Sequence, residues 1–124
     1  TSIPRSDDPL EDLRESGRRY RALALAHPMI YRVMFLRVIP GFEPSDEAKA
    51  VAASALESLA ALAQPAMDAG VMGMREPLEA AQLIWASVHG AMSLELLEIG
   101  PCDPANNASA FSEVCSTVLR GLAP

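Results

Sequence analysis

The sequence predicts a single all-α domain of about five helices, and three observations support this. Half of the residues are hydrophobic but only 5% are aromatic, so alanine, leucine and methionine, which favour helices, supply most of the apolar content. Apolar residues recur at steps of three and four, and no segment alternates with the period of two that a strand requires. The 124 residues are enough for one domain with its own core, so we treat residues 1–124 as one unit.

Two helices are expected before residue 40. Asp8 can cap the first, with Pro9 in its first turn and Glu11 placed to complete a capping box. Its apolar seam consists of Leu10, Leu13, Gly17, Tyr20, Ala24 and His27. Pro28 should end or kink that helix. The segment Met29–Ile39, apolar apart from two arginines, should form a short and largely buried second helix.

A loop over residues 40–44 leads to a third, alanine-rich helix that Ser45 can cap. The apolar face of this helix consists of Val51, Ala55, Leu59, Leu62 and Ala66. Pro65 lacks the N–H needed for a hydrogen bond in mid-helix, which predicts a kink there. The glycines of the segment Gly70–Gly73 should end the helix.

The segment Leu78–Ile99 predicts a central helix whose apolar residues form two groups. One group consists of Leu78, Ala81, Trp85, Val88, Met92, Leu96 and Ile99. The group on nearly the opposite side consists of Leu83, Ser87, Gly90, Leu94 and Leu97. A helix with two apolar sides must be covered on both. We expect the first side to meet the core and the second to meet another subunit.

The last helix is expected over Ala108–Leu122, after a loop rich in proline and asparagine. Its spacing gives the clearest amphipathic pattern in the chain. The apolar stripe consists of Phe111, Val114, Cys115, Val118, Leu119 and Leu122.

The net charge of −6 is unevenly distributed. Residues 1–37 carry seven basic and five acidic residues, whereas residues 38–124 carry three basic and eleven acidic ones. Most of the chain should therefore repel phosphate, which argues against nucleic-acid binding by this domain alone. The arginines of the first helix are interpreted as a solvated face, with Glu11–Arg14 and Glu15–Arg19 as pairs on its outside.

Several kinds of chemistry have no supporting motif. Cys102 and Cys115 match neither a zinc-ligand spacing nor a disulfide framework, and there is no phosphate-binding loop or nucleophile elbow. No cofactor and no metal are expected. The longest uncharged run of the central helix, Ala80–Leu94, is too short to span a bilayer, and no signal peptide is recognisable. We expect a cytoplasmic protein.

Trp85 and His89 are one helical turn apart and should share a face. Glu95 lies well away from His89 on the helical wheel, so no acid–base pair is indicated and no residue is assigned a catalytic role. Two interpretations of His89 stay open. It is either a core histidine satisfied by a hydrogen bond or the polar contact of a ligand cavity.

Two segments carry a family resemblance. Trp85–Gly90 reads Trp-Ala-Ser-Val-His-Gly, and His27–Phe35 reads His-Pro-Met-Ile-Tyr-Arg-Val-Met-Phe. Together with the order of helices, they make the chain resemble the C-terminal regulatory domain of TetR-family bacterial transcriptional repressors, in the branch with a Trp-x-x-x-His-Gly motif. The resemblance implies a homodimer in which the last two long helices of each subunit form a four-helix bundle.

The resemblance also implies a small effector bound in the core and an N-terminal helix-turn-helix domain that binds DNA. No helix-turn-helix segment occurs in this sequence, so we expect a domain taken from a longer repressor. DNA would then be bound only through that N-terminal domain.

These arguments give two sets of expected site residues. The ligand, small and mainly apolar, should contact Met34, Phe35, Leu59, Leu62, Met67, Trp85, His89 and Met92. The dimer interface should contain Leu83, Ser87, Gly90, Leu94, Leu97, Phe111, Val114 and Val118. The alternative is a dimeric helical scaffold that binds no ligand. A sensor should contain an internal void, whereas a scaffold should be packed solid.

Overall fold

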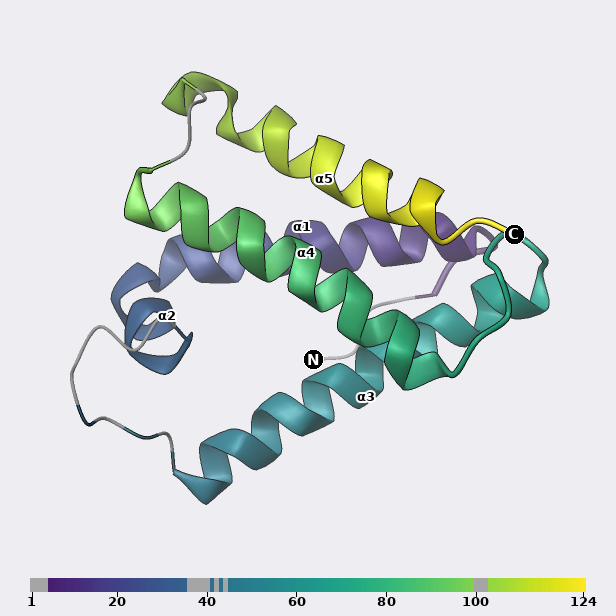
Figure 1. Cartoon of the computed structure of the whole chain (residues 1–124), viewed down its shortest axis with the longest axis horizontal. Helices are drawn as coiled ribbons and strands as arrows, with labels where there is room; N and C mark the ends of the chain where they lie inside the picture. Colours follow the sequence, from purple (N-terminus) through teal and green to yellow (C-terminus); the bar gives the residue numbers. More distant parts are fainter. Residues whose placement is uncertain (1–4, 36–40, 42, 44, 100–102) are drawn as a thin grey trace.

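The computed structural model describes residues 5–35, 41, 43, 45–99 and 103–124 (Figure 1). This part of the chain contains α-helices and one short 3₁₀ helix but no strand, which confirms the all-α prediction. The elements are α1 (Pro9–Ala26), α2 (Pro28–Phe35), α3 (Asp46–Asp68), α4 (Pro77–Leu97), η1 (Pro104–Asn106) and α5 (Asn107–Gly121). None of these helices is long and apolar enough to cross a membrane.

Helix α1 packs against each of the other three long helices, α3, α4 and α5. Helices α4 and α5 lie side by side and run in opposite directions, with α1 behind them (Figure 1). Helix α3 packs on the other side of α4 and meets α1 as well. At one end of the molecule the α3–α4 connection is joined to the C-terminus, because the Gly73 N–H donates to the Leu122 carbonyl at 2.8 Å.

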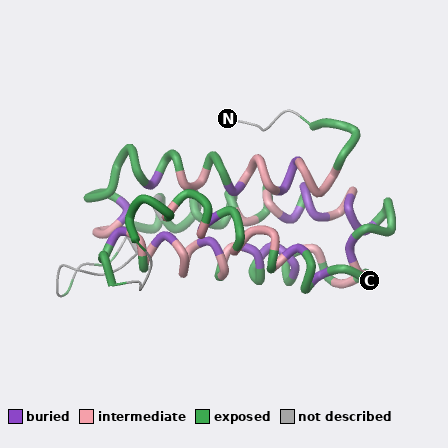
Figure 2. The backbone as a smooth tube through the Cα atoms, turned by 90° about the horizontal axis from the view of Figure 1, so that it is seen from above, coloured by how far each residue is buried: buried purple, intermediate pink, exposed green. Residues whose placement is uncertain are grey.

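The core consists of two clusters, and the buried positions recur along one side of each long helix (Figure 2). The first, near the joined end, contains Leu13, Leu62, Ala63, Ala66, Met67, Met72, Ala80, Ile84, Leu119 and Leu122. The second contains Ala24, Tyr31, Val88, Met92, Leu96 and Phe111, with Tyr20, Trp85, Ala91 and Cys115 packed against it. Only the second cluster includes polar aromatic side chains.

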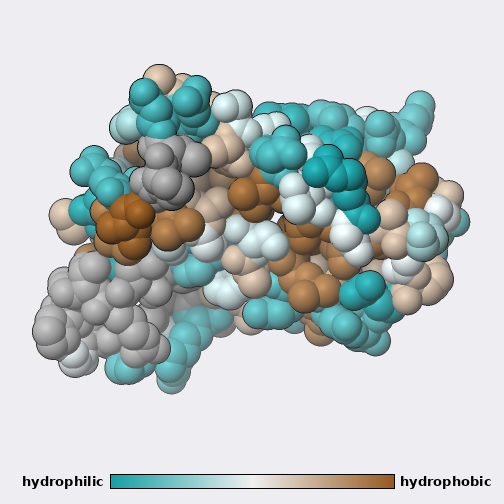
Figure 3. Space-filling model, turned by 45° about the horizontal axis from the view of Figure 1, so that its top comes forward, coloured by the Kyte–Doolittle hydropathy of each residue, from teal (hydrophilic) through white to brown (hydrophobic). Residues whose placement is uncertain are grey.

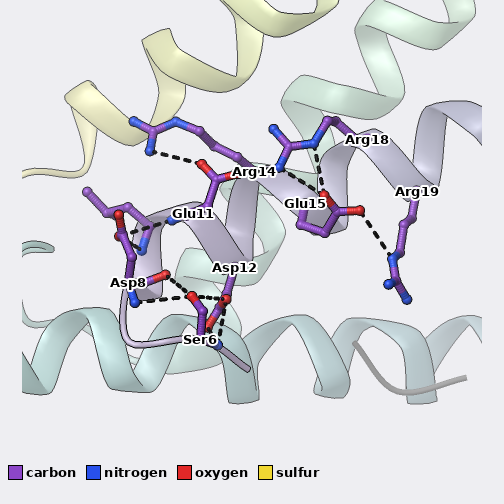
Figure 4. Close-up of polar contacts among 9 residues, drawn as sticks. Ser6, Asp8, Glu11, Asp12, Arg14, Glu15, Arg18 and Arg19 are labelled. Carbon is purple, nitrogen blue, oxygen red and sulfur yellow. Dashed lines mark hydrogen bonds and ion pairs between the residues drawn. The ribbon is translucent and has the colours of Figure 1, made fainter. Parts of the chain in front are cut away.

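The N-terminus of α1 is capped as expected, but without a capping box. Asp8 Oδ1 accepts the first-turn N–H groups of Leu10 and Glu11 at 3.1 and 3.2 Å (Figure 4). The Glu11 carboxylate instead accepts a hydrogen bond from Arg18, and the Asp8 N–H donates to Ser6 Oγ at 3.1 Å. The capping-box prediction was wrong because an arginine two turns along the helix competes for Glu11.

Helix α3 continues through Pro65, and the N-terminal segment supplies the donor that proline lacks. In a regular helix the N–H of residue 65 would donate to the carbonyl of Ala61. Here Arg5 Nη2 donates to that carbonyl at 3.1 Å. The backbone acceptor that Pro65 leaves unpaired is therefore satisfied by a side chain 56 residues earlier in the chain.

Helix α2 is less buried than expected. Met29 and Ile30 are 63% and 62% exposed, whereas Tyr31 is only 6% exposed. The helix turns one side chain of this stretch into the core and leaves its neighbours at the surface. Residues 36–39 of the predicted helix lie outside the described residues.

Helix α4 is slightly shorter than predicted. It ends at Leu97, and Glu98 adopts a left-handed conformation with φ 57°. Leu78 and Ile99, placed by the sequence on the inward side, are 46% and 66% exposed. Both stand at the ends of the helix, where no neighbouring helix covers them.

Helices α1 and α5 approach each other closely at Gly17. A Cβ atom at this position would lie 3.0 Å from Cys115 Sγ and 3.7 Å from the Phe111 ring. The absence of a side chain at Gly17 therefore allows α5 to pack against α1.

We expect Gly17→Val to lower the free energy of unfolding by about 1–3 kcal/mol, because the added methyl groups would force α1 and α5 apart. Ala22→Val on the exposed side of the same helix is the matched control and should cost roughly 0.5 kcal/mol or less. Urea denaturation followed by circular dichroism measures both. Equal losses in the two variants would show that the close approach at Gly17 does not constrain the packing.

Candidate ligand site in the core

Three polar side chains from three helices meet inside the second core cluster. Tyr20 of α1, Tyr31 of α2 and His89 of α4 form a triangle, which we call the Tyr–Tyr–His cluster. The two hydroxyl oxygens are 2.6 Å apart, and His89 Nδ1 lies 2.7 Å from the Tyr31 oxygen and 3.3 Å from the Tyr20 oxygen. Buried phenol and imidazole groups need such partners.

Burial fixes the protonation of the Tyr–Tyr–His cluster. Desolvation raises the pKa of the Tyr20 hydroxyl and, together with the hydrogen bond shared with Tyr20, that of the Tyr31 hydroxyl. Desolvation also lowers the pKa of the His89 imidazole. Both phenols therefore keep their protons at neutral pH and His89 is neutral. Its Nδ1 can then accept from Tyr31 while Nε2 carries the ring proton.

The aromatic rings of the cluster pack against one another and against Trp85. The Trp85 and His89 rings are 5.0 Å apart between centroids, with an interplanar angle of 33°, which confirms that these two residues share a face. The Tyr31 and His89 rings are 5.6 Å apart, and Tyr20 meets Tyr31 edge to face at 5.9 Å. The result is an aromatic surface with polar atoms at its centre.

A small apolar cavity adjoins this surface. Its volume is about 50 Å³, and Tyr20 and Trp85 belong both to its wall and to the aromatic surface. The other lining residues are Leu13, Ser16, Gly17, Leu59, Ile84, Val88, Cys115, Val118 and Leu119. Pockets for drug-sized ligands usually measure about 300–1,000 Å³, so this cavity has room for only a small group.

The walls of this cavity differ from those expected for the ligand pocket. The expected walls were α2, α3 and α4, whereas the structure has α1, α3, α4 and α5 around it. The reason is that α1 packs through the middle of the domain and contacts all three other long helices. Periodicity identified the apolar face of α1 but not this central position.

The expected ligand residues are accordingly distributed over three places. Leu59 and Trp85 line the cavity, and His89 belongs to the Tyr–Tyr–His cluster. Leu62, Met67 and Met92 are fully packed in the core at 8%, 3% and 0% exposure. The side chains of Met34 and Phe35 lie outside the described part of the structure.

The sequence analysis did not assign Tyr20 or Tyr31 to the site. A signal was present, because Tyr20 stands on the apolar seam of the first helix and Tyr31 lies in the His27–Phe35 segment. A phenol on an inward face requires a hydrogen-bond partner. Three helices must be placed in space before that partner can be named.

Further polar bonds hold α1 and α2 to the last turns of α4. Arg21 donates through two nitrogens to Glu95, each at 3.2 Å, and Arg32 Nη2 donates to the Leu96 carbonyl. Glu95 is thus paired with Arg21. Among the described residues, no group of histidine, cysteine, aspartate and glutamate side chains could hold a metal ion.

The expected dimer residues on α4 are at the surface. Leu83, Leu94 and Leu97 are 40%, 49% and 41% exposed. A Cβ at Gly90 would meet no atom within 4 Å, and Ser87, half-buried, donates to the Leu83 carbonyl at 2.9 Å. The face of the domain drawn in Figure 3 exposes hydrophobic residues between hydrophilic ones.

The expected dimer residues on α5 largely turn inward instead. Phe111 is only 5% exposed and packs beside Gly17, and Val118 lines the cavity. Val114 is half-buried. Within the single chain, Phe111 and Val118 therefore face α1 and the cavity, because the apolar stripe of α5 covers α1 and the core.

We expect the domain to lose stability as the pH falls from 7.5 to 5.5. Above about pH 6.5 His89 is neutral in both the folded and unfolded states. As the pH falls through that value, the unfolded chain takes up a proton that the folded chain resists, so the free energy of unfolding decreases. Urea denaturation at several pH values measures this slope.

His89→Gln should reduce the pH dependence, and His27→Gln is the matched control because His27 is exposed. An unchanged slope in the His89 variant would show that burial does not suppress its protonation.

Comparison with known proteins supports the family suggested by the sequence. No curated protein and no solved structure matches the chain. The family model described as "Tetracyclin repressor-like, C-terminal domain" matches residues 13–118, which extend from the first turns of α1 to the last turn of α5 and include the Tyr–Tyr–His cluster. The chain therefore belongs to the tetracyclin repressor-like C-terminal domain family.

Proposed function

We propose that this chain is the effector-sensing and dimerisation domain of a TetR-like transcriptional regulator and that it binds a small, mainly apolar molecule. The observation that carries the proposal is the Tyr–Tyr–His cluster beside an apolar cavity. Tyr20, Tyr31 and His89 offer hydrogen-bonding atoms at the edge of an apolar space, which is how ligand pockets combine affinity with orientation.

The lining of the cavity indicates a neutral effector. None of the residues around the cavity is charged, and the nearby Arg21 is paired with Glu95. Most of the affinity would come from buried apolar area, at about 25 cal/mol per Å² before the costs of association. The Tyr–Tyr–His cluster would orient the ligand through one hydrogen bond.

A ligand larger than a few atoms must widen the cavity. Two walls are suited to move, because Leu59 and Trp85 are only half-buried. Their displacement would bring the ligand against His89 and Tyr20. Moving these two side chains costs free energy, which the effector must offset by burying apolar area. This cost therefore sets the smallest apolar area that gives binding.

The polar bonds between helices provide a route from the ligand to the rest of the regulator. Tyr20 and Tyr31 bind α1 and α2 to His89 of α4. A ligand that takes over one of these bonds changes how the three helices are held. A change in the position of α1 would be passed to an N-terminal DNA-binding domain that precedes it. The acidic domain described by this chain is not expected to bind DNA alone.

Dimerisation is assigned to the exposed apolar face of α4. Leu83, Leu94 and Leu97 would otherwise leave a hydrophobic patch in water, and Gly90 would allow a second helix to approach closely. Val114 of α5 completes this surface in place of Phe111 and Val118. Two copies related by a two-fold axis would bury the patch on both subunits.

One observation favours the alternative of a dimeric scaffold without a ligand. The cavity of about 50 Å³ is small for a sensor. The sensor and the scaffold would both be dimers. They differ in whether the core can bind a small molecule.

We expect apolar ligands to shift the fluorescence emission of Trp85, the only tryptophan in the chain. His89→Ala or Tyr31→Phe should weaken binding roughly tenfold, which corresponds to the loss of one hydrogen bond to a buried group. His27→Ala is the matched control, because that side chain is exposed. Titration of a panel of neutral apolar compounds would reject sensing if none changes the Trp85 emission.

We expect a dimer in size-exclusion chromatography with light scattering, at twice the chain mass of 13.2 kDa. Gly90→Leu and Leu94→Lys should each shift the equilibrium toward the monomer. Leu23→Lys is the matched control, since Leu23 is 65% exposed on α1 and lies outside the proposed interface. A wild-type monomer at micromolar concentration would contradict the dimer.

A further inference from the structure

A second, larger hollow lies on the outside of the domain between α1 and α5. Its volume is about 420 Å³, within the range of small-molecule sites. We call it the α1–α5 groove, and its lining residues are Arg14, Arg18, Arg21, Ala22, Leu25, Ala108, Phe111, Ser112 and Cys115. Cys115 also lines the core cavity described above, so the two hollows share this residue in their walls.

Every charged residue that lines the groove is an arginine. Arg14, Arg18 and Arg21 occupy successive turns of α1, in a chain whose net charge is −6. Figure 4 shows Arg14 and Arg18 extending from the same side of α1, whereas Arg19 extends from another. The groove thus presents three guanidinium groups on an acidic protein, each paired with a glutamate that lies outside the groove.

Carboxylates outside the groove hold these arginines in place. Glu15 accepts from Arg18 Nε at 3.0 Å, and Glu11 accepts from Arg18 Nη2. Glu95 accepts from Arg21 Nε and Nη2. None of the three carboxylates lines the groove. Arg14 Nη1 also lies 3.9 Å from Glu11 Oε2. Since a guanidinium has five N–H donors, all three arginines, including Arg14 and Arg18, retain donors for a further anion.

The rest of the groove is mainly apolar. Leu25, 41% exposed, and Ala22 line it on the α1 side, and the Phe111 ring closes it from α5. An aliphatic chain along these groups would be removed from water, while its charged end would reach the arginines. This combination fits an amphiphile better than a simple inorganic anion, which would leave the apolar wall exposed.

We propose that the α1–α5 groove binds a small amphiphilic carboxylate, with its aliphatic chain along Leu25 and Phe111 and its carboxylate on Arg14 and Arg18. Planar guanidinium groups match a carboxylate in two parallel hydrogen bonds. The volume of the groove suits a single small molecule and is too small for a helix of a protein partner. This site is separate from the core site of the proposed function.

The test uses isothermal titration calorimetry of the whole domain with decanoate as the probe. Removing both arginines, in Arg14→Gln/Arg18→Gln, should raise the dissociation constant at least tenfold, because charge-assisted hydrogen bonds are lost. Arg19→Gln is the matched control from the same helix and should leave the constant unchanged. Ala22→Phe, at an exposed position, should abolish binding by filling the groove while the circular dichroism spectrum stays native.

Further measurements test whether the carboxylate group is required and whether the probe binds in the groove. Decanol should bind at least tenfold more weakly than decanoate, and added salt should weaken decanoate binding. His89→Ala should leave decanoate binding intact, whereas it weakens ligands of the core site. The proposal is overturned if decanoate fails to bind, if decanol binds equally well, or if the Arg14/Arg18 and Arg19 variants behave alike. Loss of binding in His89→Ala would place the carboxylate in the core instead.

Discussion

The structure depends on one constraint, which is that three polar side chains packed against an apolar core, one buried and two half-buried, need hydrogen-bond partners there. Tyr20, Tyr31 and His89 come from three different helices, and their polar atoms lie within 2.6–3.3 Å. Leaving one such group without a partner costs about 1–3 kcal/mol. The relative positions of α1, α2 and α4 are therefore fixed by chemistry as well as by packing.

Helix α2 shows the constraint most clearly. Its eight residues include two large side chains at the surface and one, Tyr31, in the core. Tyr31 bonds to His89 of α4 and to Tyr20 of α1, and Arg32 donates to the Leu96 carbonyl of α4. If these bonds can be arranged in two ways, a ligand that binds one arrangement more tightly increases the population of the corresponding helix positions. The same cluster that stabilises the fold would thus report the ligand.

The sequence predicted most of the secondary structure and the orientation of α4. The cap at Asp8, the break at Pro28 and the two apolar sides of α4 follow from local rules about proline, capping residues and periodicity. These rules depend on neighbours in the chain, which the sequence contains. The shared face of Trp85 and His89 was predictable for the same reason.

The site was harder to predict, because periodicity shows which face of a helix is apolar but not which element covers it. Phe111 and Val118 belong to a correctly identified stripe, yet within the chain this stripe packs against α1 and the cavity. The pairing of Tyr20 with Tyr31 and His89 spans up to 69 residues. Such a contact depends on helix packing, for which the sequence carried no local signal.

The central claim is that the core of this domain admits an apolar guest beside the Tyr–Tyr–His cluster. Crystallography under xenon pressure tests it without knowledge of the effector, since apolar cavities bind xenon. The account requires a xenon atom in the cavity lined by Tyr20, Leu59 and Trp85. If the core contains no xenon at a pressure that fills a known apolar cavity in a reference protein, the claim is contradicted. The alternative of a dimeric scaffold without a ligand would then be favoured.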